Sequence, residues 1–389
     1  MTLLVLAEVF AMSLWFVSSA ILVDLQRQVA LSGFQSAMLV SSVAVGFVVG
    51  ALYVAMSGIA DRYDPRKVFA ASAVLAALAN TLMLIAEPGG ALSVMLRILT
   101  GFALAGVYPV GMKIAVGWGL RDRGWLIGLL VGGLTLGSAS PHLLSYLGGA
   151  NWKLTTVLAS SLATLAAVLV MFTQLGPHHA RSASMNPRAI TLAWTDRKLR
   201  CAFIGYLGHM WELYALWAWI APAAAASYML HTDELQAAQW SKLTAFVAIG
   251  SGALLCPFAG RLADAVGKAE LTILAMTLSG GSAILAALVF GGPVWLVATV
   301  FILWGLSVIP DSAQFSALVA DIAPPENAGS LMSLQTALGF ALTIVTVQLT
   351  PVLADAIGWP GLFCVLAIGP LVGIVSMNAL RRSRLDAAL

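Results

Sequence analysis

Charged side chains are scarce in this sequence. Of its 389 residues, 10% are Asp, Glu, Lys or Arg, whereas 60% are hydrophobic. A soluble domain carries about 25% charged residues, because its surface must be hydrated. The composition therefore excludes a soluble enzyme, a nucleic-acid-binding protein and a disordered chain.

Cysteine is also rare, and the common catalytic motifs are missing. Cys201, Cys256 and Cys364 lie far apart in apolar runs and form no C-x-x-C pair, so neither a disulfide framework nor a zinc site is indicated. The sequence contains no H-E-x-x-H, no P-loop and no nucleophile elbow. We therefore expect no catalytic residues, no metal, no cofactor and no ATP-driven transport within this chain.

What the sequence has instead is long apolar runs. A membrane helix needs about 20 mostly apolar residues, and the sequence offers twelve such runs: 3–23, 37–59, 67–86, 91–118, 124–147, 152–175, 201–228, 240–262, 269–291, 293–320, 327–353 and 359–380. The one long polar segment, residues 176–200, lies between the sixth and the seventh run. We predict an all-α membrane protein with twelve transmembrane helices in two six-helix bundles, 1–175 and 201–389, joined by a central cytoplasmic loop at 176–200.

The few basic residues predict the orientation of these spans. Fifteen of the 20 Lys and Arg residues fall on the side of both termini, and three, Arg27, Lys153 and Lys242, fall on the other side. The remaining two lie inside the fourth run. Cytoplasmic loops of membrane proteins are rich in Lys and Arg, so we expect both termini to be cytoplasmic.

The two halves repeat each other at an offset of about 203 residues. The closest match is between the first and the seventh run, where Glu8 and Trp15 correspond to Glu212 and Trp219 at an offset of 204. Internal repeats of this kind place a binding site near the membrane midplane, between the halves. The repeat therefore predicts two pseudo-symmetric bundles with a site at their interface.

The loop after the second run carries a motif, Asp61-Arg62-Tyr63-Asp64-Pro65-Arg66-Lys67. It resembles the signature G-x-x-x-D-R-x-G-R-[KR] of the major facilitator superfamily, although Ser57 replaces the leading glycine and Asp64-Pro65 replaces Gly-Arg. A second copy, Gly260 to Lys268, contains Asp264 but lacks the following arginine. The resemblance covers the whole chain, with twelve spans, a central loop and two related halves.

This resemblance implies a fold, a location and a mechanism. It implies the two-bundle fold, alternating access, the bacterial inner membrane and a monomer embedded in the bilayer. The loop residues Asp61, Arg62, Arg66 and Asp264 would latch the outward-facing state, unless these charged loops only hold the orientation. The opening Met12 to Phe16 is similar to cyanate/nitrate-type and small-molecule efflux members.

Seven Asp, Glu, His, Lys and Arg residues lie deep inside the apolar runs, at least five residues from either end: Glu8, Arg97, Lys113, His142, His209, Glu212 and Asp311. A charge at the bilayer centre costs several kcal/mol unless it is paired or faces water. These residues are therefore the candidates for substrate binding and proton coupling.

Each half offers an acid and an indole on one helical face. Glu8 and Trp15 are seven residues apart, as are Glu212 and Trp219, and His209 lies one turn before Glu212. In the family that the chain resembles, these first helices line the central cavity. Our hypothesis is that Glu212 and Asp311 handle protons, while Glu8, Trp15 and Trp219 help to hold the substrate. The alternative is that each glutamate only bonds a neighbouring helix.

Three of these residues have two interpretations each, and Arg97 has one. Asp311 follows Pro310, which kinks its helix, and carries either a proton or a structural hydrogen bond. Arg97-x3-Gly101 resembles the second motif of the family and implies a buried, proton-linked network. His142 either shuttles protons or packs between helices, and Lys113 either binds substrate or extends its amine to the membrane surface.

These observations lead to one expected function. We expect a secondary transporter that moves a small organic solute by alternating access and is coupled to protons. Two alternatives remain open, namely an uncoupled facilitator and a receptor-like membrane protein that binds without transport.

Overall fold

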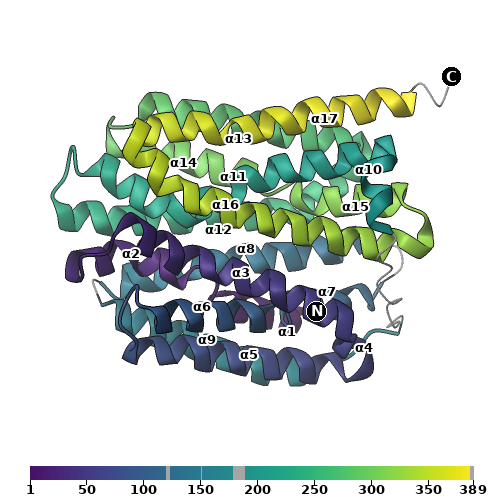
Figure 1. The fold of residues 1–389 in the computed structure, drawn as a ribbon, viewed down its shortest axis with the longest axis horizontal. Coiled ribbons are helices and arrows are strands. Elements are labelled where there is room, and N and C mark those ends of the chain that lie inside the picture. Colours follow the sequence, from purple (N-terminus) through teal and green to yellow (C-terminus); the bar gives the residue numbers. More distant parts are fainter. Residues whose placement is uncertain (120–122, 150, 178–188, 386–389) are drawn as a thin grey trace.

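The structure, a computed structural model, describes residues 1–119, 123–149, 151–177 and 189–385 (Figure 1). These residues form helices and turns, and no strand occurs among them. Figure 1 shows two groups of roughly parallel helices, one above the other. The purple to blue group is called here the amino-terminal bundle, and the green to yellow group the carboxyl-terminal bundle.

The amino-terminal bundle contains nine α-helices and one short 3-10 helix among the described residues. They are α1 (Thr2–Met12), α2 (Val17–Gln28), α3 (Gly33–Ser57), α4 (Ile59–Arg62), α5 (Pro65–Leu82), η1 (Met83–Ile85), α6 (Ala91–Leu104), α7 (Tyr108–Val116), α8 (Arg123–Leu147) and α9 (Trp152–Met171).

The short helix α10 (Ala189–Thr195) precedes the carboxyl-terminal bundle. That bundle consists of α11 (Arg197–Tyr228), α12 (Glu234–Val266), α13 (Lys268–Val289), α14 (Val294–Val308), α15 (Ser312–Ile322), α16 (Pro325–Leu366) and α17 (Ile368–Leu385). Most of the central loop, residues 178–188, lies outside the described residues, so the predicted domain limits stay a prediction.

Ten stretches are long and apolar enough to span a membrane. One of them, Asn327–Ser383, has 57 residues and turns back at Gly358, whose φ of 71° is left-handed, so it holds two spans. Helix α11 is not among the ten, because its His, Glu, Trp and Tyr side chains lower its hydropathy, yet its 32 residues run through the bundle. With these two additions the predicted all-α fold with twelve spans is confirmed.

Both chain ends lie toward one face of the molecule. Helix α10 and the end of α17 mark this terminal face, at the right of Figure 1. The opposite face, where α2 ends and α12 begins, is called the distal face. Local sequence fixes the helix starts there: Ser32 and Gln35 form a capping box for α3, and Asp233 caps α12 through the amide of Gln236.

Three of the spans are interrupted near their middle. The first span breaks between Met12 and Val17, the fourth between Leu104 and Tyr108, and the tenth between Val308 and Ser312. Pro109 and Pro310, which are equivalent in the repeat, lie at the fourth and tenth breaks, where a proline removes a helix hydrogen bond. The seventh span, α11, is continuous, so the two halves differ at this point.

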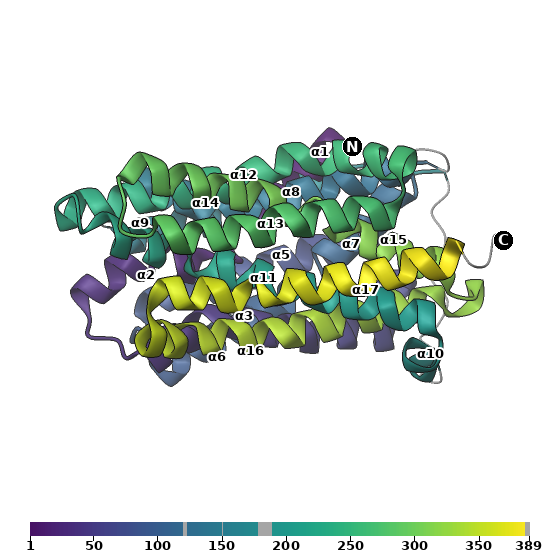
Figure 2. The same ribbon diagram turned by 90° about the horizontal axis from the view of Figure 1, so that it is seen from above.

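Glycines let helices touch backbone to backbone. A Cβ on Gly101 of α6 would lie 1.9 Å from the carbonyl oxygen of Val43 in α3. Between the bundles, a Cβ on Gly128 of α8 would lie 2.9 Å from Cα of Pro257 in α12. Helices α8 and α12 lie side by side in both views (Figures 1 and 2), and they form the longest contact between the two bundles.

Candidate functional site

An aromatic cluster fills the centre of the interface between the bundles. Trp15 in the break of the first span lies 5.7 Å from Tyr214 of α11 and 5.4 Å from Phe340 of α16, measured between ring centroids. The cluster consists of Trp15, Phe16, Phe47, Tyr214, Trp217 and Phe340. All six are nearly inaccessible to solvent.

Glu8 lies in α1, seven residues before Trp15. It is fully buried, and neither carboxylate oxygen has a hydrogen-bond partner among the described residues. Gly111 of α7 makes room for it, because a Cβ there would lie 2.6 Å from Glu8 Oε2. Tyr108, at the start of α7, lies within electrostatic range of Glu8.

Arg97 holds the break in the first span. Its guanidinium is buried and donates to the carbonyl oxygens of Leu14 at 3.0 Å and Trp15 at 2.7 Å, and to Asn80 Oδ1 at 3.1 Å. A helix break frees backbone carbonyls that need donors inside a membrane. Arg97 supplies them and thereby positions Trp15.

Glu212 and Trp219 share one face of α11, as predicted, but that face is turned into the carboxyl-terminal bundle. Glu212 accepts hydrogen bonds from Trp304 Nε1 at 2.6 Å and from Ser279 Oγ at 2.8 Å. Trp219 Nε1 donates to the carbonyl oxygen of Val347 at 3.1 Å. The repeat-related pairs therefore have different surroundings, with Trp15 at the interface and Trp219 behind it.

His209 and Asp311 form a buried pair at the break of the tenth span. His209 Nδ1 lies 3.0 Å from Asp311 Oδ1, and both side chains are about 1–2% exposed. The His209 ring packs against Tyr206 and Phe315. Asp311 also interacts electrostatically with Glu212. Sequence reasoning singled out both residues but did not pair them, because they belong to different spans.

The loop motif lies on the terminal face. Arg66 donates to Asp64 Oδ2 at 2.7 Å and to the carbonyl oxygen of Thr173 at 3.1 Å, and this guanidinium lowers the pKa of the Asp64 carboxyl. Lys113 donates to the carbonyl oxygen of Ala60 at 2.8 Å, so it lies beside this loop and away from the aromatic cluster.

The remaining loop candidates occupy the same face. Arg62 and Asp264 are exposed, and the side chain of Asp61 lies outside the described residues. In the carboxyl-terminal bundle, Lys268 pairs with Asp321 at 2.6 Å and so joins the second copy of the loop to the end of α15. Sequence reasoning missed this pair.

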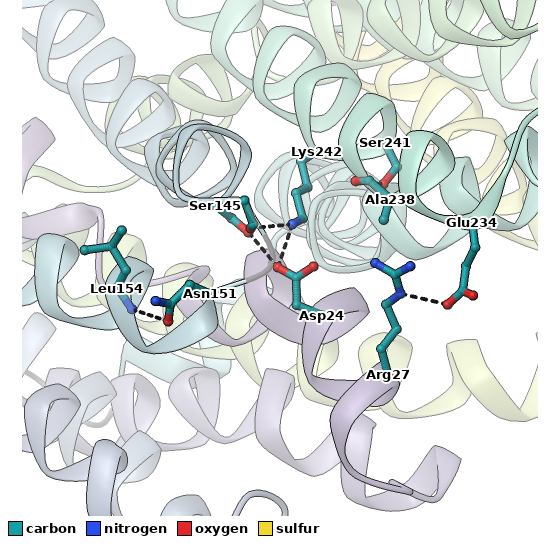
Figure 3. A network of polar contacts seen from close by, with 10 residues as sticks. Asp24, Arg27, Ser145, Asn151, Leu154, Glu234, Ala238, Ser241 and Lys242 are labelled. Atoms are coloured by element: carbon teal, nitrogen blue, oxygen red, sulfur yellow. Dashed lines mark hydrogen bonds and ion pairs between the residues drawn. The ribbon is translucent and has the colours of Figure 1, made fainter.

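The distal face holds a polar network between the bundles that sequence reasoning also missed (Figure 3). Lys242, which lies near the start of the eighth predicted run, is buried inside α12, and its Nζ lies 2.5 Å from Asp24 Oδ2 of α2. Ser145 of α8 donates to the same carboxylate oxygen at 3.2 Å, and Lys242 also donates to the carbonyl oxygen of Gly149 at 3.2 Å. His142, one turn before Ser145, is fully buried.

Two small cavities lie beside the central helices. One cavity of about 10 Å³ lies in the amino-terminal bundle beside Ser18 and Trp152, and another of about 10 Å³ lies in the carboxyl-terminal bundle beside Trp219. Each has room for about one water molecule. A solute therefore needs the bundles to separate before it reaches the aromatic cluster.

Comparison with known proteins agrees with this architecture. The sequence profile of the Major Facilitator Superfamily matches residues 3–309, and a further match covers residues 202–387. The chain belongs to the major facilitator superfamily. Membership of this superfamily, together with the twelve spans, identifies it as a multi-pass membrane transporter.

The fold of this transporter is also found among solved structures, of which 308 chains match. A crystal structure of a mutant of the nucleoside transporter NupG superposes with a TM-score of 0.71 over 97% of this chain and 99% of that chain, at 14% sequence identity. At this identity the similarity shows the shared fold alone. No curated protein matches the sequence.

Proposed function

We propose that this transporter is a proton-coupled secondary carrier of a small organic solute that works by alternating access. The observation that supports coupling best is the His209–Asp311 pair, 3.0 Å apart and buried at the break of the tenth span. Imidazole gains or loses a proton near physiological pH when water reaches it, and a carboxylate beside it favours the protonated imidazole. A break in a central helix is a point where a small motion admits water.

The protonation of this pair would change the contact between α11 and α15. A neutral pair holds the two helices weakly, whereas an imidazolium facing a carboxylate holds them strongly, because opposite charges attract more in a medium of low dielectric constant. Proton binding is thereby linked to the geometry of the tenth span. Glu212, which is bonded to Trp304 and Ser279, would support this pair electrostatically.

The solute site in this proposal is the aromatic cluster with Tyr108 and Glu8 beside it. Aromatic rings stack on planar groups and attract cations, and a buried carboxylate without partners favours a cation or a hydrogen-bond donor. A planar heterocycle with polar substituents fits both features. Nucleosides are thus the first solutes to test, since NupG, which has the same fold, is a nucleoside transporter.

The orientation and the loop contacts complete the proposal. We place the termini and the terminal face in the cytoplasm of a bacterium, because the basic loops lie there, and we propose that the chain works as a monomer in the inner membrane. Asp61, Arg62, Arg66 and Asp264 would hold the terminal face closed. Lys113, which is bonded to Ala60, joins this group.

Uptake into proteoliposomes tests the function. A thermal-shift screen of nucleosides, with aliphatic sugars of similar size as controls, first selects a solute. Uptake of that solute should rise when the pH gradient is imposed and should fall to the no-gradient level when an ionophore removes it. Uptake that ignores the gradient would indicate a uniporter, and binding without uptake would indicate a receptor.

Two substitutions of similar shape then locate the proton site. Asp311→Asn should abolish gradient-driven uptake while exchange of labelled for unlabelled solute survives. Glu212→Gln is the matched comparison, because Glu212 lies on the same face of α11 as His209. If only Asp311→Asn abolishes the gradient response, protons bind at the His209–Asp311 pair; if only Glu212→Gln does so, they bind at Glu212 and the pair is structural.

A further inference from the structure

The Asp24–Lys242 ion pair is the only ion pair between the bundles, among the described residues, whose two side chains are both buried. Asp24 lies at the end of α2 in one bundle, and Lys242 lies near the start of α12 in the other. Alternating access requires the distal ends of the two bundles to part. This contact must therefore break whenever the distal face opens.

The geometry of the pair favours the closed face. A buried ion pair repays the loss of hydration only when its geometry is good and further hydrogen bonds satisfy the remaining polar atoms. Here the Nζ to Oδ2 distance is 2.5 Å, Ser145 donates to the same carboxylate oxygen, and the carbonyl oxygen of Gly149 accepts from Lys242. Nearby, Arg27 and Glu234 form an exposed pair across the same face (Figure 3), and exposed pairs contribute little.

His142 lies just inside this contact. It is one helical turn before Ser145 on α8, is fully buried and interacts electrostatically with Lys242. Neither of its ring nitrogens has a hydrogen-bond partner among the described residues, and the same is true of Asp24 Oδ1. His142 is thus buried with no partner for its ring, one turn before the serine that donates to Asp24, and such an imidazole binds a proton when water reaches it.

The charged groups around His142 are few. Lys242 comes from α12 and Asp24 from α2. Glu8 of α1 packs at Gly133 of α8, more than two turns from His142, and the single ionisable residue of α9, Lys153, is exposed. Lys113 of α7 is bonded at the terminal face. A proton on His142 would therefore act chiefly on Asp24 and Lys242.

We propose that Asp24 and Lys242 form the gate of the distal face, and that His142 opens this gate when it binds a proton. An imidazolium would repel Lys242 and would offer Asp24 a counter-ion from the same bundle. The ion pair between the bundles is thereby exchanged for one within the amino-terminal bundle. The role as a gate rests on the proposed function as a carrier, but the gate is measured without any solute.

Distances between spin labels on the two bundles test the gate. Phe34 of α3 and Leu230 at the end of α11 are exposed at the distal face and serve as label sites after conversion to Cys, in a chain whose three native cysteines are replaced. Lys242→Met leaves the Asp24 carboxylate buried without its counter-ion in the closed state but hydrated in the open state. It should raise the ratio of long to short distances about 100-fold or more.

Two further variants keep this test informative if Lys242→Met folds poorly. The charge-exchanged Asp24→Lys/Lys242→Asp should restore the short distance, and the uncharged Asp24→Asn/Lys242→Met, which buries no charge, should stay short. Glu234→Gln, which removes the exposed pair at the same face, is the control and should leave the distances unchanged. The gate is overturned if the distance distribution of Lys242→Met equals that of Glu234→Gln. It is also overturned if the distances of the charge-exchanged variant stay long.

The pH dependence tests His142. A hydrated imidazole has a pKa near 6.5. If the proton binds only the open state, the population of the open state relative to the closed state should therefore rise about tenfold when the pH falls from 8 to 5.5. This shift should be present in the wild type and absent in His142→Gln. A shift of equal size in His142→Gln overturns the sensor role. A protein that shows the gate but takes up no solute would refute the proposed function and leave the gate standing.

Discussion

Replacing Arg97 by Met should destabilise the whole amino-terminal bundle. The guanidinium joins α6 to the carbonyl oxygens of Leu14 and Trp15 and to Asn80 of α5, through three hydrogen bonds of 2.7–3.1 Å. Hydrogen bonds between membrane helices contribute about 0.6 kcal/mol each, and a buried acceptor left without its donor costs about 1–3 kcal/mol. Removal of the buried cation offsets part of this cost, so we expect the free energy of unfolding to fall by about 2–4 kcal/mol.

Unfolding of the purified protein in mixed micelles with increasing SDS measures this loss. Arg97→Lys keeps the charge but presents one compact donor group, so it should fall between the wild type and Arg97→Met. Lys153→Met is the control, because Lys153 is an exposed cation at the start of α9 and its removal should change stability by no more than about 0.5 kcal/mol. An Arg97→Met protein as stable as this control would refute the idea that Arg97 holds the break.

Three more predictions concern the site and the loop. Trp15→Ala should cost about 3–5 kcal/mol by the same SDS titration, whereas Trp15→Phe should cost less than half of that, because a ring still fills the cluster. Gly111→Ala should displace the Glu8 carboxylate, 2.6 Å from the new Cβ, and should weaken solute binding in thermal-shift assays without loss of folding; unchanged binding would remove Glu8 from the site. Asp64 caps α5, and Arg66 lowers the pKa of the Asp64 carboxyl. The contribution of Asp64 to stability is therefore complete above the ordinary carboxyl pKa of about 3.9, and it is lost as the pH falls through the lower pKa of the folded state. Asp64→Asn should not show this loss.

The sequence predicted the spans and the repeat well, because both depend on hydrophobicity over 20 residues. It could not predict which way the repeated residues face. Trp15 lies in the break at 13–16, whereas its counterpart Trp219 lies in the continuous helix α11. The break turns the chain and brings Trp15 to the interface. A seven-residue spacing shows that two side chains share a face, but the neighbouring helices decide where this face points.

The polar contacts between spans were also beyond the sequence. Asp24 and Lys242 look like ordinary residues at the ends of apolar runs, where charged side chains reach the membrane surface. Their burial follows from the meeting of α2 and α12, which depends on packing between the bundles. The only sign of this contact in the sequence was an acid near the end of the first run and a base near the start of the eighth run. Each lies within one or two residues of a run limit.

The contact between α8 and α12 has a mechanical consequence. Where Gly128 and Gly132 face Pro257 and Ala253, the helices touch along smooth backbone, with no side chains interlocked at those points. Helices that touch along their backbone rotate past one another without rotamer changes in their side chains, so the energy barrier to relative rotation of the bundles is low along this line. Small side chains introduced there would hinder the relative rotation of the bundles. Gly132→Ala should therefore hold the carrier in one conformational state, which would help structural work.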